Sequence, residues 1–197
     1  MKISILCSLM LLSFGSVFAQ PARQDTTLVY NNPGYNKDPL RATLRKEVLR
    51  KDSIWQVNLY NKKQLVETIS YADEKLEIRK GYYAFYTNGV LTEEGNFEKG
   101  YKHGNWKIFY PTKQLAEQRK FYYGKLLQLI SFWEDGVVKS RGKYYDGKKV
   151  NSWEEYHKNG KLASHENYDI SGNLLEATYF NETGAKVSIK NLTGIIN

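Results

Sequence analysis

The 197-residue chain contains one cysteine, Cys7, and this scarcity excludes several kinds of chemistry. A single thiol forms no internal disulfide and no multi-cysteine metal site. The three histidines, His103, His157 and His165, lack the spacing of a helical metal-ligand pair. The sequence also has no HExxH, no GxSxG and no phosphate-cradling glycine loop. We therefore expect no catalytic residues, no bound metal and no cofactor.

Long hydrophobic runs are also missing, except at the beginning of the chain. Lys2 precedes an apolar stretch over residues 3–14, and small residues lead to Ala19 and Gln20. This arrangement predicts a secretory signal peptide over residues 1–19, because the stretch is too short for a membrane span. We expect cleavage near Ala19-Gln20 and a protein secreted to the periplasm or cell surface.

Positive charge gathers near the start of the expected mature chain, whereas the whole sequence has a net charge of +8. Residues 37–51 hold six basic and two acidic side chains within a linker or arm over residues 20–53. Asp38-Pro39 and the spacing of Leu40, Leu44 and Val48 indicate an amphipathic helix over residues 39–51. An extended strand joining a sheet is the alternative. Arg45 and Arg50 are candidate contacts for an anionic membrane surface.

A repeat of 23 to 26 residues organises most of the remaining sequence. Its aromatic or leucine anchors are Leu59, Phe85, Phe109, Phe132, Tyr156 and Phe180. A second large apolar residue follows each anchor by twelve positions, at Tyr71, Phe97, Phe121, Tyr144, Tyr168 and Leu192. A fixed period of this length predicts an array of small supersecondary units over residues 54–197.

Each unit is predicted to be a β-hairpin. Polar and apolar residues alternate before the anchors, and glycine follows many anchors by four positions. The pairs Asn88-Gly89, Asp135-Gly136 and Asn159-Gly160 predict tight turns in which both residues have positive φ. Where Lys63 and Lys113 replace the glycine, we expect less regular turns. Gly95 and Gly142 are expected to leave room for a neighbouring aromatic ring.

The stretch of residues 104–110, and its counterpart at residues 153–162, resemble the MORN-variant repeats of bacterial proteins, which are often described as antitoxin-like. The resemblance extends over roughly residues 54–192. It implies an all-β fold: an elongated, twisted antiparallel meander of about six hairpin repeats, with the helix over residues 39–51 as a candidate cap. It also implies a binding or scaffolding role. An antitoxin function conflicts with the predicted signal peptide, so we do not transfer it.

The aromatic residues allow two interpretations. They form the core of a thin sheet, zipped by cross-strand pairs, or they provide a stacking platform for sugars or bases. The first interpretation is favoured because the spacing follows the architecture. The aromatic residues predicted to reach an exposed, ligand-binding face are Trp106, Tyr110, Trp133, Trp153 and Tyr156.

The sequence thus predicts a non-enzymatic secreted protein that acts as a protein–protein interaction scaffold. Its expected partner is another envelope protein, because exposed sheet edges and faces are templates for association. The alternative is binding of envelope glycan or an anionic membrane surface through the aromatic face and the basic arm. Nucleic acid is not expected as a partner of a secreted chain.

Overall fold

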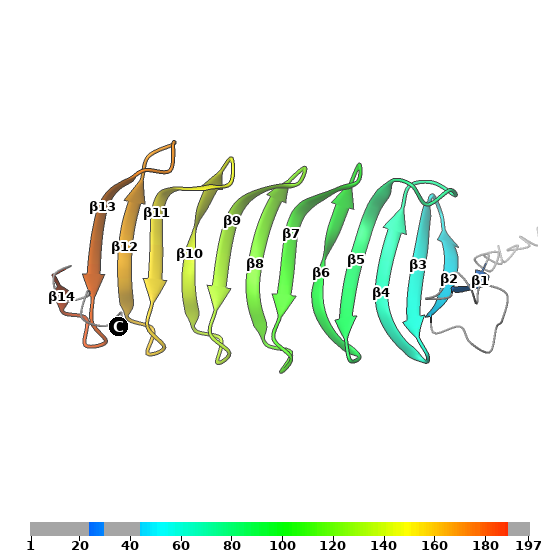
Figure 1. Ribbon diagram of the computed structural model, residues 1–197, viewed down its shortest axis with the longest axis horizontal. Coiled ribbons are helices and arrows are strands. Elements are labelled where there is room, and N and C mark those ends of the chain that lie inside the picture. Colours follow the sequence, from blue (N-terminus) through cyan, green and yellow to red (C-terminus); the bar gives the residue numbers. More distant parts are fainter. Residues whose placement is uncertain (1–23, 30–43, 189–197) are drawn as a thin grey trace, which may run out of the picture.

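The computed structural model describes residues 24–29 and 44–188, which form one antiparallel sheet of 14 strands (Figure 1). The strands lie in the order of the sequence, from β1 to β14, so every strand pairs with its neighbours along the chain. This arrangement confirms the predicted all-β meander of hairpins. The predicted signal peptide, residues 1–19, lies outside the described residues.

The strands are β1 (Gln24–Val29), β2 (Leu44–Lys51), β3 (Ile54–Asn61), β4 (Gln64–Tyr71), β5 (Arg79–Thr87), β6 (Val90–Glu98), β7 (Tyr101–Phe109), β8 (Leu115–Tyr122), β9 (Lys125–Phe132), β10 (Val138–Tyr145), β11 (Lys148–Tyr156), β12 (Leu162–Tyr168), β13 (Leu174–Phe180) and β14 (Lys186–Val187). The described part contains no helix, and therefore none that could cross a bilayer.

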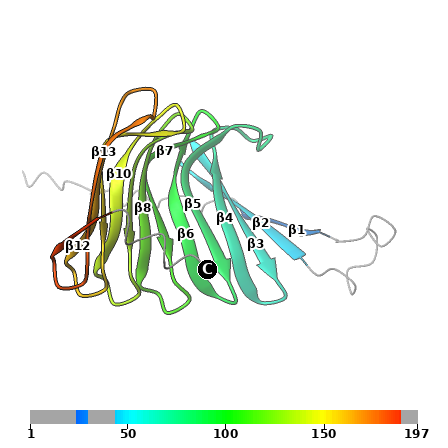
Figure 2. The ribbon, with the colours of Figure 1, turned by 60° about the vertical axis from the view of Figure 1, so that its left-hand side comes forward.

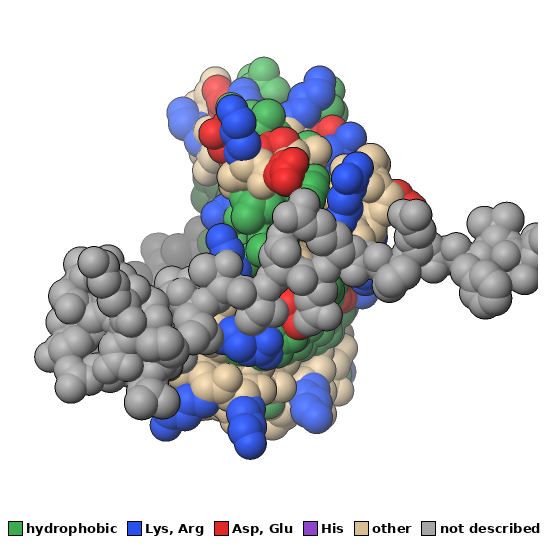
Figure 3. Space-filling view, turned by 90° about the vertical axis from the view of Figure 1, so that its right-hand side faces the viewer, with side chains coloured by type: hydrophobic (Ala, Val, Ile, Leu, Met, Phe, Trp, Pro, Cys, Tyr) green, Lys and Arg blue, Asp and Glu red, His purple; other side chains and the backbone are tan. Residues whose placement is uncertain are grey.

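The sheet is a single curved layer with two rims (Figures 1 and 2). We call the top edge in Figure 1 the upper rim; it holds the connections that follow the even-numbered strands. The bottom edge, or lower rim, holds the connections that follow the odd-numbered strands from β3 onward. Lysine and arginine side chains project from both rims when the sheet is seen from its amino-terminal end (Figure 3).

The predicted helix over residues 39–51 is wrong from Leu44 onward, because Leu44–Lys51 form strand β2. All eight residues of β2 pair in register with β3, and β2 also pairs with β1. Val48 lies opposite Val57, and the burial of these two side chains stabilises the extended conformation. Residues 39–43 lie outside the described part. The sheet therefore begins within the segment that the sequence assigned to an arm.

Register divides the side chains between two faces. Residues that are opposite one another on neighbouring strands share a face. The face that we call aromatic carries Val57, Ile69, Tyr83 and Gly95 in one row, because these four residues are successive cross-strand partners. The other face, which we call polar, carries the row of Asn58, Thr68, Ala84 and Glu94.

The turns are more varied than the sequence predicted. Asn88-Gly89 forms the expected two-residue turn, with φ of 51° and 77°. At Asp135-Gly136 only the glycine has positive φ, and Gly136 donates a hydrogen bond to Trp133 across a longer turn. The predicted two-residue geometry is wrong there because the Asp135 carboxylate accepts a hydrogen bond from the Val137 amide, which holds Asp135 in the ordinary region.

Asn159-Gly160 departs from the prediction in the same way, and the Asn159 side chain accepts the Lys161 amide. The turn at Lys113 was expected to be irregular, and this is also wrong. Lys113 adopts φ of 72° and donates its amide to Tyr110 at 2.8 Å, as the glycines do in the matching turns. A lysine is therefore held in a glycine conformation by the flanking strand pairing.

Candidate interaction surfaces

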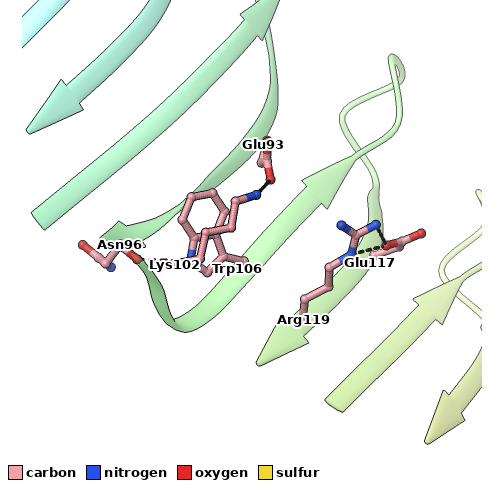
Figure 4. A network of polar contacts seen from close by, with 6 residues as sticks. All are labelled: Glu93, Asn96, Lys102, Trp106, Glu117 and Arg119. Carbon is pink, nitrogen blue, oxygen red and sulfur yellow. Dashed lines mark hydrogen bonds and ion pairs between the residues drawn. The ribbon is translucent and has the colours of Figure 1, made fainter. Parts of the chain in front are cut away.

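Trp106 lies at the centre of an aromatic cluster on the middle of the sheet. Its side chain is fully buried, and its ring lies over Gly95 of the preceding strand. A Cβ atom added to Gly95 would come within 2.3 Å of the indole. The indole N–H donates to the backbone carbonyl of Asn96 at 3.1 Å (Figure 4). Tyr83 and Phe97 contact the ring at centroid distances of 5.4 and 5.2 Å.

Trp153 repeats this arrangement two units later. It is 3% exposed, lies over Gly142, and donates to the carbonyl of Lys143 at 2.9 Å. Gly95 and Gly142 lack the positive φ of the turn glycines, so the rings above them explain the absence of a side chain. The prediction that these two glycines make room for a ring is confirmed. Trp106 and Trp153 thus offer no exposed stacking surface.

A lysine lies over each buried indole, with its ammonium 4.0 Å from the Trp106 ring for Lys102 and 4.5 Å from the Trp153 ring for Lys149. Lys102 forms an ion pair with Glu93 at 2.6 Å (Figure 4), and Lys149 forms one with Glu166 at 3.6 Å. The two carboxylates come from opposite sides of the lysine-bearing strand. The cation–indole contact is therefore the shared element of the two sites.

In the first site, Arg119 occupies the position that Glu166 has in the second, and its guanidinium binds Glu117 at 2.7 Å (Figure 4). Arg119 and Lys102 carry the same charge, so Lys102 turns to Glu93 on the other side.

Hydrogen bonds from side chains to main-chain carbonyls, which we call staples, connect successive units along the lower rim. After the anchors Phe109, Phe132 and Tyr156, the next residue bonds to the backbone carbonyl of the following anchor. Tyr110 donates to Phe132 at 2.7 Å, and the Trp133 indole donates to Tyr156 at 3.2 Å. His157 Nε2 lies 2.9 Å from the carbonyl oxygen of Phe180, which can only accept, so this nitrogen carries the proton. The side chains of Tyr110 and Trp133 are therefore held in place by the main chain of the next repeat unit.

Trp133 and Tyr156 are the two predicted aromatic site residues that the structure brings together. Both line a cavity of about 410 Å³, together with Lys139 and Lys158. The two ammonium groups lie 4.6 and 5.6 Å from the Trp133 ring. Glu155 and Glu182 also line the cavity, so its charge is mixed.

Arg45 and Arg50 are not brought together. Arg45 lies opposite Tyr60 on the polar face, stacks on that ring at 4.1 Å and pairs with Glu47. Arg50 lies opposite Trp55 on the aromatic face and contacts its ring at 5.4 Å. A strand separates residues five positions apart onto opposite faces. The single basic surface that a helix would have presented is therefore absent from β2.

The upper rim carries exposed apolar side chains that the sequence analysis did not single out. They lie in or beside successive connections: Ile78, Tyr101, Tyr122, Tyr123, Tyr145 and Ile170. Tyr101, Tyr122 and Tyr145 are each 57% exposed. The signal that could have found them is the run of tyrosines beside the two-residue turns, since tyrosine is common at protein interfaces.

The same rim is held together by side chains that reach from one turn to the next. Tyr101 covers the turn at Gly124, where an added Cβ would lie 3.3 Å from the ring. Lys125 pairs with Asp146 at 3.1 Å. Together with the lower-rim staples, these contacts fix the spacing of the units at both edges of the sheet.

The described residues contain one serine–histidine pair within hydrogen-bond distance, and it lacks the surroundings of a catalytic pair. Ser152 Oγ lies 3.2 Å from His165 Nε2, but the pair is exposed, and among the described residues this is the one side-chain hydrogen bond of His165. A nucleophile–base pair normally needs a third group that orients the base. Within the described ranges, no group of three or more His, Cys, Asp or Glu side chains is arranged to hold a metal ion.

Glu154, on the polar face, is held by two polar neighbours. The hydroxyl of Tyr156 donates to its carboxylate at 2.7 Å, and Arg141 forms an ion pair with it. The hydrogen bond from Tyr156, followed by that from Arg141, lowers the pKa of Glu154 below its usual value. Burial and the same carboxylate raise the pKa of Tyr156.

Comparison with known proteins identifies the repeat. Residues 102–123 and 149–169 match the family model described as "MORN repeat variant". Both matched segments begin at the lysine that covers the buried indole, Lys102 or Lys149, so the match falls on the two equivalent tryptophan sites. Repeats of this kind generally act as protein- or membrane-binding modules and are typically non-catalytic. No curated protein matches the sequence.

One solved structure with partial likeness is that of S. aureus TarM in complex with fondaparinux, α-GlcNAc-glycerol and UDP. It is 11% identical and has a TM-score of 0.36. The match covers 53% of this chain and 21% of that one, so this chain spans about a fifth of the TarM length. At this level the likeness assigns neither a fold nor an activity.

Proposed function

We propose that this MORN-type repeat protein is a non-enzymatic scaffold for protein–protein interaction, exported from the cytoplasm. The observation that carries the proposal is the contrast between the rims. The upper rim presents exposed tyrosines at successive turns, whereas the exposed side chains in the described turns of the lower rim are mainly polar and its aromatic rings are half-buried. Tyrosine supplies large contact area with few rotatable bonds, which suits a docking surface on a rigid sheet.

Affinity capture tests this function. We would immobilise the chain from Gln20 onward, which is the product expected from signal-peptide cleavage. Envelope extract from the source cell would be applied at low and at high salt, and the bound material identified by mass spectrometry. One or two proteins retained in near-stoichiometric amounts at high salt are expected. Retention of no protein under either condition would overturn the scaffold.

Variants locate the surface in the same assay. Replacing Tyr145 and Ile170 with serine removes two exposed apolar side chains from the upper rim, and we expect partner retention to fall. Phe85 is 40% exposed but lies away from that rim, so Phe85→Ser is the matched control. If the unaltered protein, the Tyr145→Ser, Ile170→Ser variant and Phe85→Ser all retain the partner equally, the partner does not bind at the upper rim.

The second candidate function is binding of envelope glycan or an anionic membrane surface. The Trp133–Tyr156 cavity with its two lysines favours it, because aromatic rings stack on sugars and ammonium groups attract anions. Trp133→Ala with Lys158→Ala should then reduce retention of lipid or glycan, and salt should weaken it further. Salt-resistant retention of protein by the same variant supports the scaffold instead.

Export is proposed from the sequence of residues 1–19. Expression in a Gram-negative host followed by fractionation and intact-mass measurement checks it. We expect a periplasmic product that begins at Gln20. Recovery of the uncleaved chain in the cytoplasm would contradict export.

A further inference from the structure

Two adjoining cavities open on the polar face between β7 and β11. One, of about 150 Å³, is lined by Asn105, Gln118 and Ile130, and the other, of about 430 Å³, by Lys143, Tyr145 and Ile170. Lys120 and Gln128 line both cavities, so the two form one groove across the sheet.

The polar residues of the groove form a straight row. Asn105 is the cross-strand partner of Lys120, Lys120 is the partner of Gln128, and Gln128 is the partner of Lys143. Cross-strand partners share a face, so amide and ammonium groups alternate along this row. Strands are about 4.8 Å apart, which places Lys120 and Lys143 roughly 10 Å from each other along the row.

The charges of the row are available to a ligand. Among the described residues, no carboxylate forms an ion pair with Lys120 or Lys143, and the side chains of Asn105 and Gln128 make no hydrogen bond. The nearby lysines of the upper rim and the aromatic face are different, because Lys125 pairs with Asp146 and Lys149 with Glu166. The groove is thus a local excess of positive charge and of unused donors.

The end of the groove nearest the upper rim is apolar. Leu127, Tyr145 and Ile170 line it and are 37%, 57% and 64% exposed. Two cations beside an exposed apolar patch are complementary to a ligand that carries both acidic and apolar groups.

We propose that this groove binds an extended acidic segment of a protein partner, in which an acidic residue recurs at every third position and apolar residues lie between. The inference rests on the proposed scaffold function and deepens it by naming the partner's chemistry. In a polyproline II segment the rise is about 3.1 Å per residue, so carboxylates three residues apart are roughly 9 Å apart and meet Lys120 and Lys143. A hollow in the sheet admits a peptide, whereas a flat bilayer does not enter it.

Fluorescence anisotropy with a labelled peptide tests the proposal. The probe is four repeats of Glu-Pro-Leu, titrated with the full chain. Probes with Lys-Pro-Leu and Glu-Pro-Ser repeats test the need for acidic and for apolar groups. We expect binding of the first probe alone, weakened at least tenfold by Lys120→Glu with Lys143→Glu.

Lys63→Glu with Lys113→Glu is the matched control, since it makes the same charge change on the lower rim. It should leave affinity within twofold. Lys120→Gln with Lys143→Gln gives a milder variant should the charge reversal disturb folding, which circular dichroism would reveal. Equal loss in both charge-reversed variants, or no binding of the acidic probe to the unaltered chain, would overturn the proposal.

Other polyanions and the affinity capture separate the remaining outcomes. Binding of dextran sulfate or phosphatidylserine vesicles that depends on Lys120 and Lys143, without binding of the peptide, would also overturn it. If the captured protein partner is retained equally by the Lys120→Glu, Lys143→Glu variant, the groove inference fails while the scaffold function stands. If no protein is captured at all, the scaffold function itself fails.

Discussion

Replacing Gly95 with alanine would disrupt the centre of the sheet. An added Cβ would lie 2.3 Å from the Trp106 ring, whereas ordinary contact begins near 3.4 Å, so the ring has to move by about an ångström. That movement breaks the indole hydrogen bond to Asn96, which is worth about 1 kcal/mol. It also weakens the contacts with Tyr83 and Phe97, worth about 1 kcal/mol each beyond burial.

Alanine also reduces the conformational entropy of the unfolded chain, which offsets about 0.5–1 kcal/mol of this loss in stability. We therefore expect Gly95→Ala to lower the free energy of unfolding by about 2–2.5 kcal/mol, within the range for overpacked cores. Urea denaturation followed by circular dichroism measures it. Asn96→Ala is the matched control. The Asn96 side chain is exposed and forms no hydrogen bond among the described residues, so this change should alter stability by less than about 0.5 kcal/mol.

A double-mutant cycle isolates the cause. In a Trp106→Ala background the Cβ meets no ring, so Gly95→Ala should then cost less than about 0.5 kcal/mol. Gly142→Ala should repeat the result against Trp153, where the added Cβ would lie 2.2 Å from the ring. Additive costs, or a Gly95→Ala protein as stable as the unaltered one, would refute the steric reasoning.

Three further changes test other parts of the fold. Lys113→Gly should raise the free energy of unfolding by about 0.5–1 kcal/mol, because Lys113 has φ of 72°, and the same change at Lys158 should lower it; urea denaturation that shows the reverse order would contradict this. Tyr110→Phe should cost about 1 kcal/mol through the lost bond to Phe132, with exposed Tyr145→Phe as a neutral control. The Glu154→Gln protein should be less stable than the unaltered protein at pH 7, and this difference in the free energy of unfolding should shrink as the pH falls below 4.5. The reason is that the pKa of Glu154 is lowered in the folded state, so its stabilising contribution is complete above the unfolded value and is lost as the pH falls through the folded value. A difference that stays constant from pH 7 to 3 would exclude this linkage.

Periodicity was enough to predict the hairpin meander and the role of Gly95. Each depends on a local pattern, the alternation along a strand or a small residue between large ones, that packing reinforces. Segment 44–51 was harder, because Leu44 and Val48 are four residues apart and fit both a helix face and a strand face. Its strand pairs with β3 on one side and β1 on the other, and such pairing is not visible from the segment alone.

The candidate site residues were predicted less well. Tryptophan is a common residue at binding surfaces, which is why Trp106 and Trp153 were predicted as site residues. In the structure, each ring packs over a glycine on the neighbouring strand and is buried there. Trp133 lacks such a glycine partner and stays half-buried at the lower rim. The groove at Lys120 and Lys143 depends on strand register, which places side chains 23 residues apart in one row.

The staples of the lower rim give the array a direction. Tyr110, Trp133 and His157 each reach toward the carboxyl-terminal neighbour, and each meets a main-chain carbonyl that belongs to a later unit. A unit that has already formed therefore presents the donor that positions the unit after it. Assembly in the order in which a chain emerges from a ribosome or a translocation channel can proceed one hairpin at a time, and each hairpin guides the next.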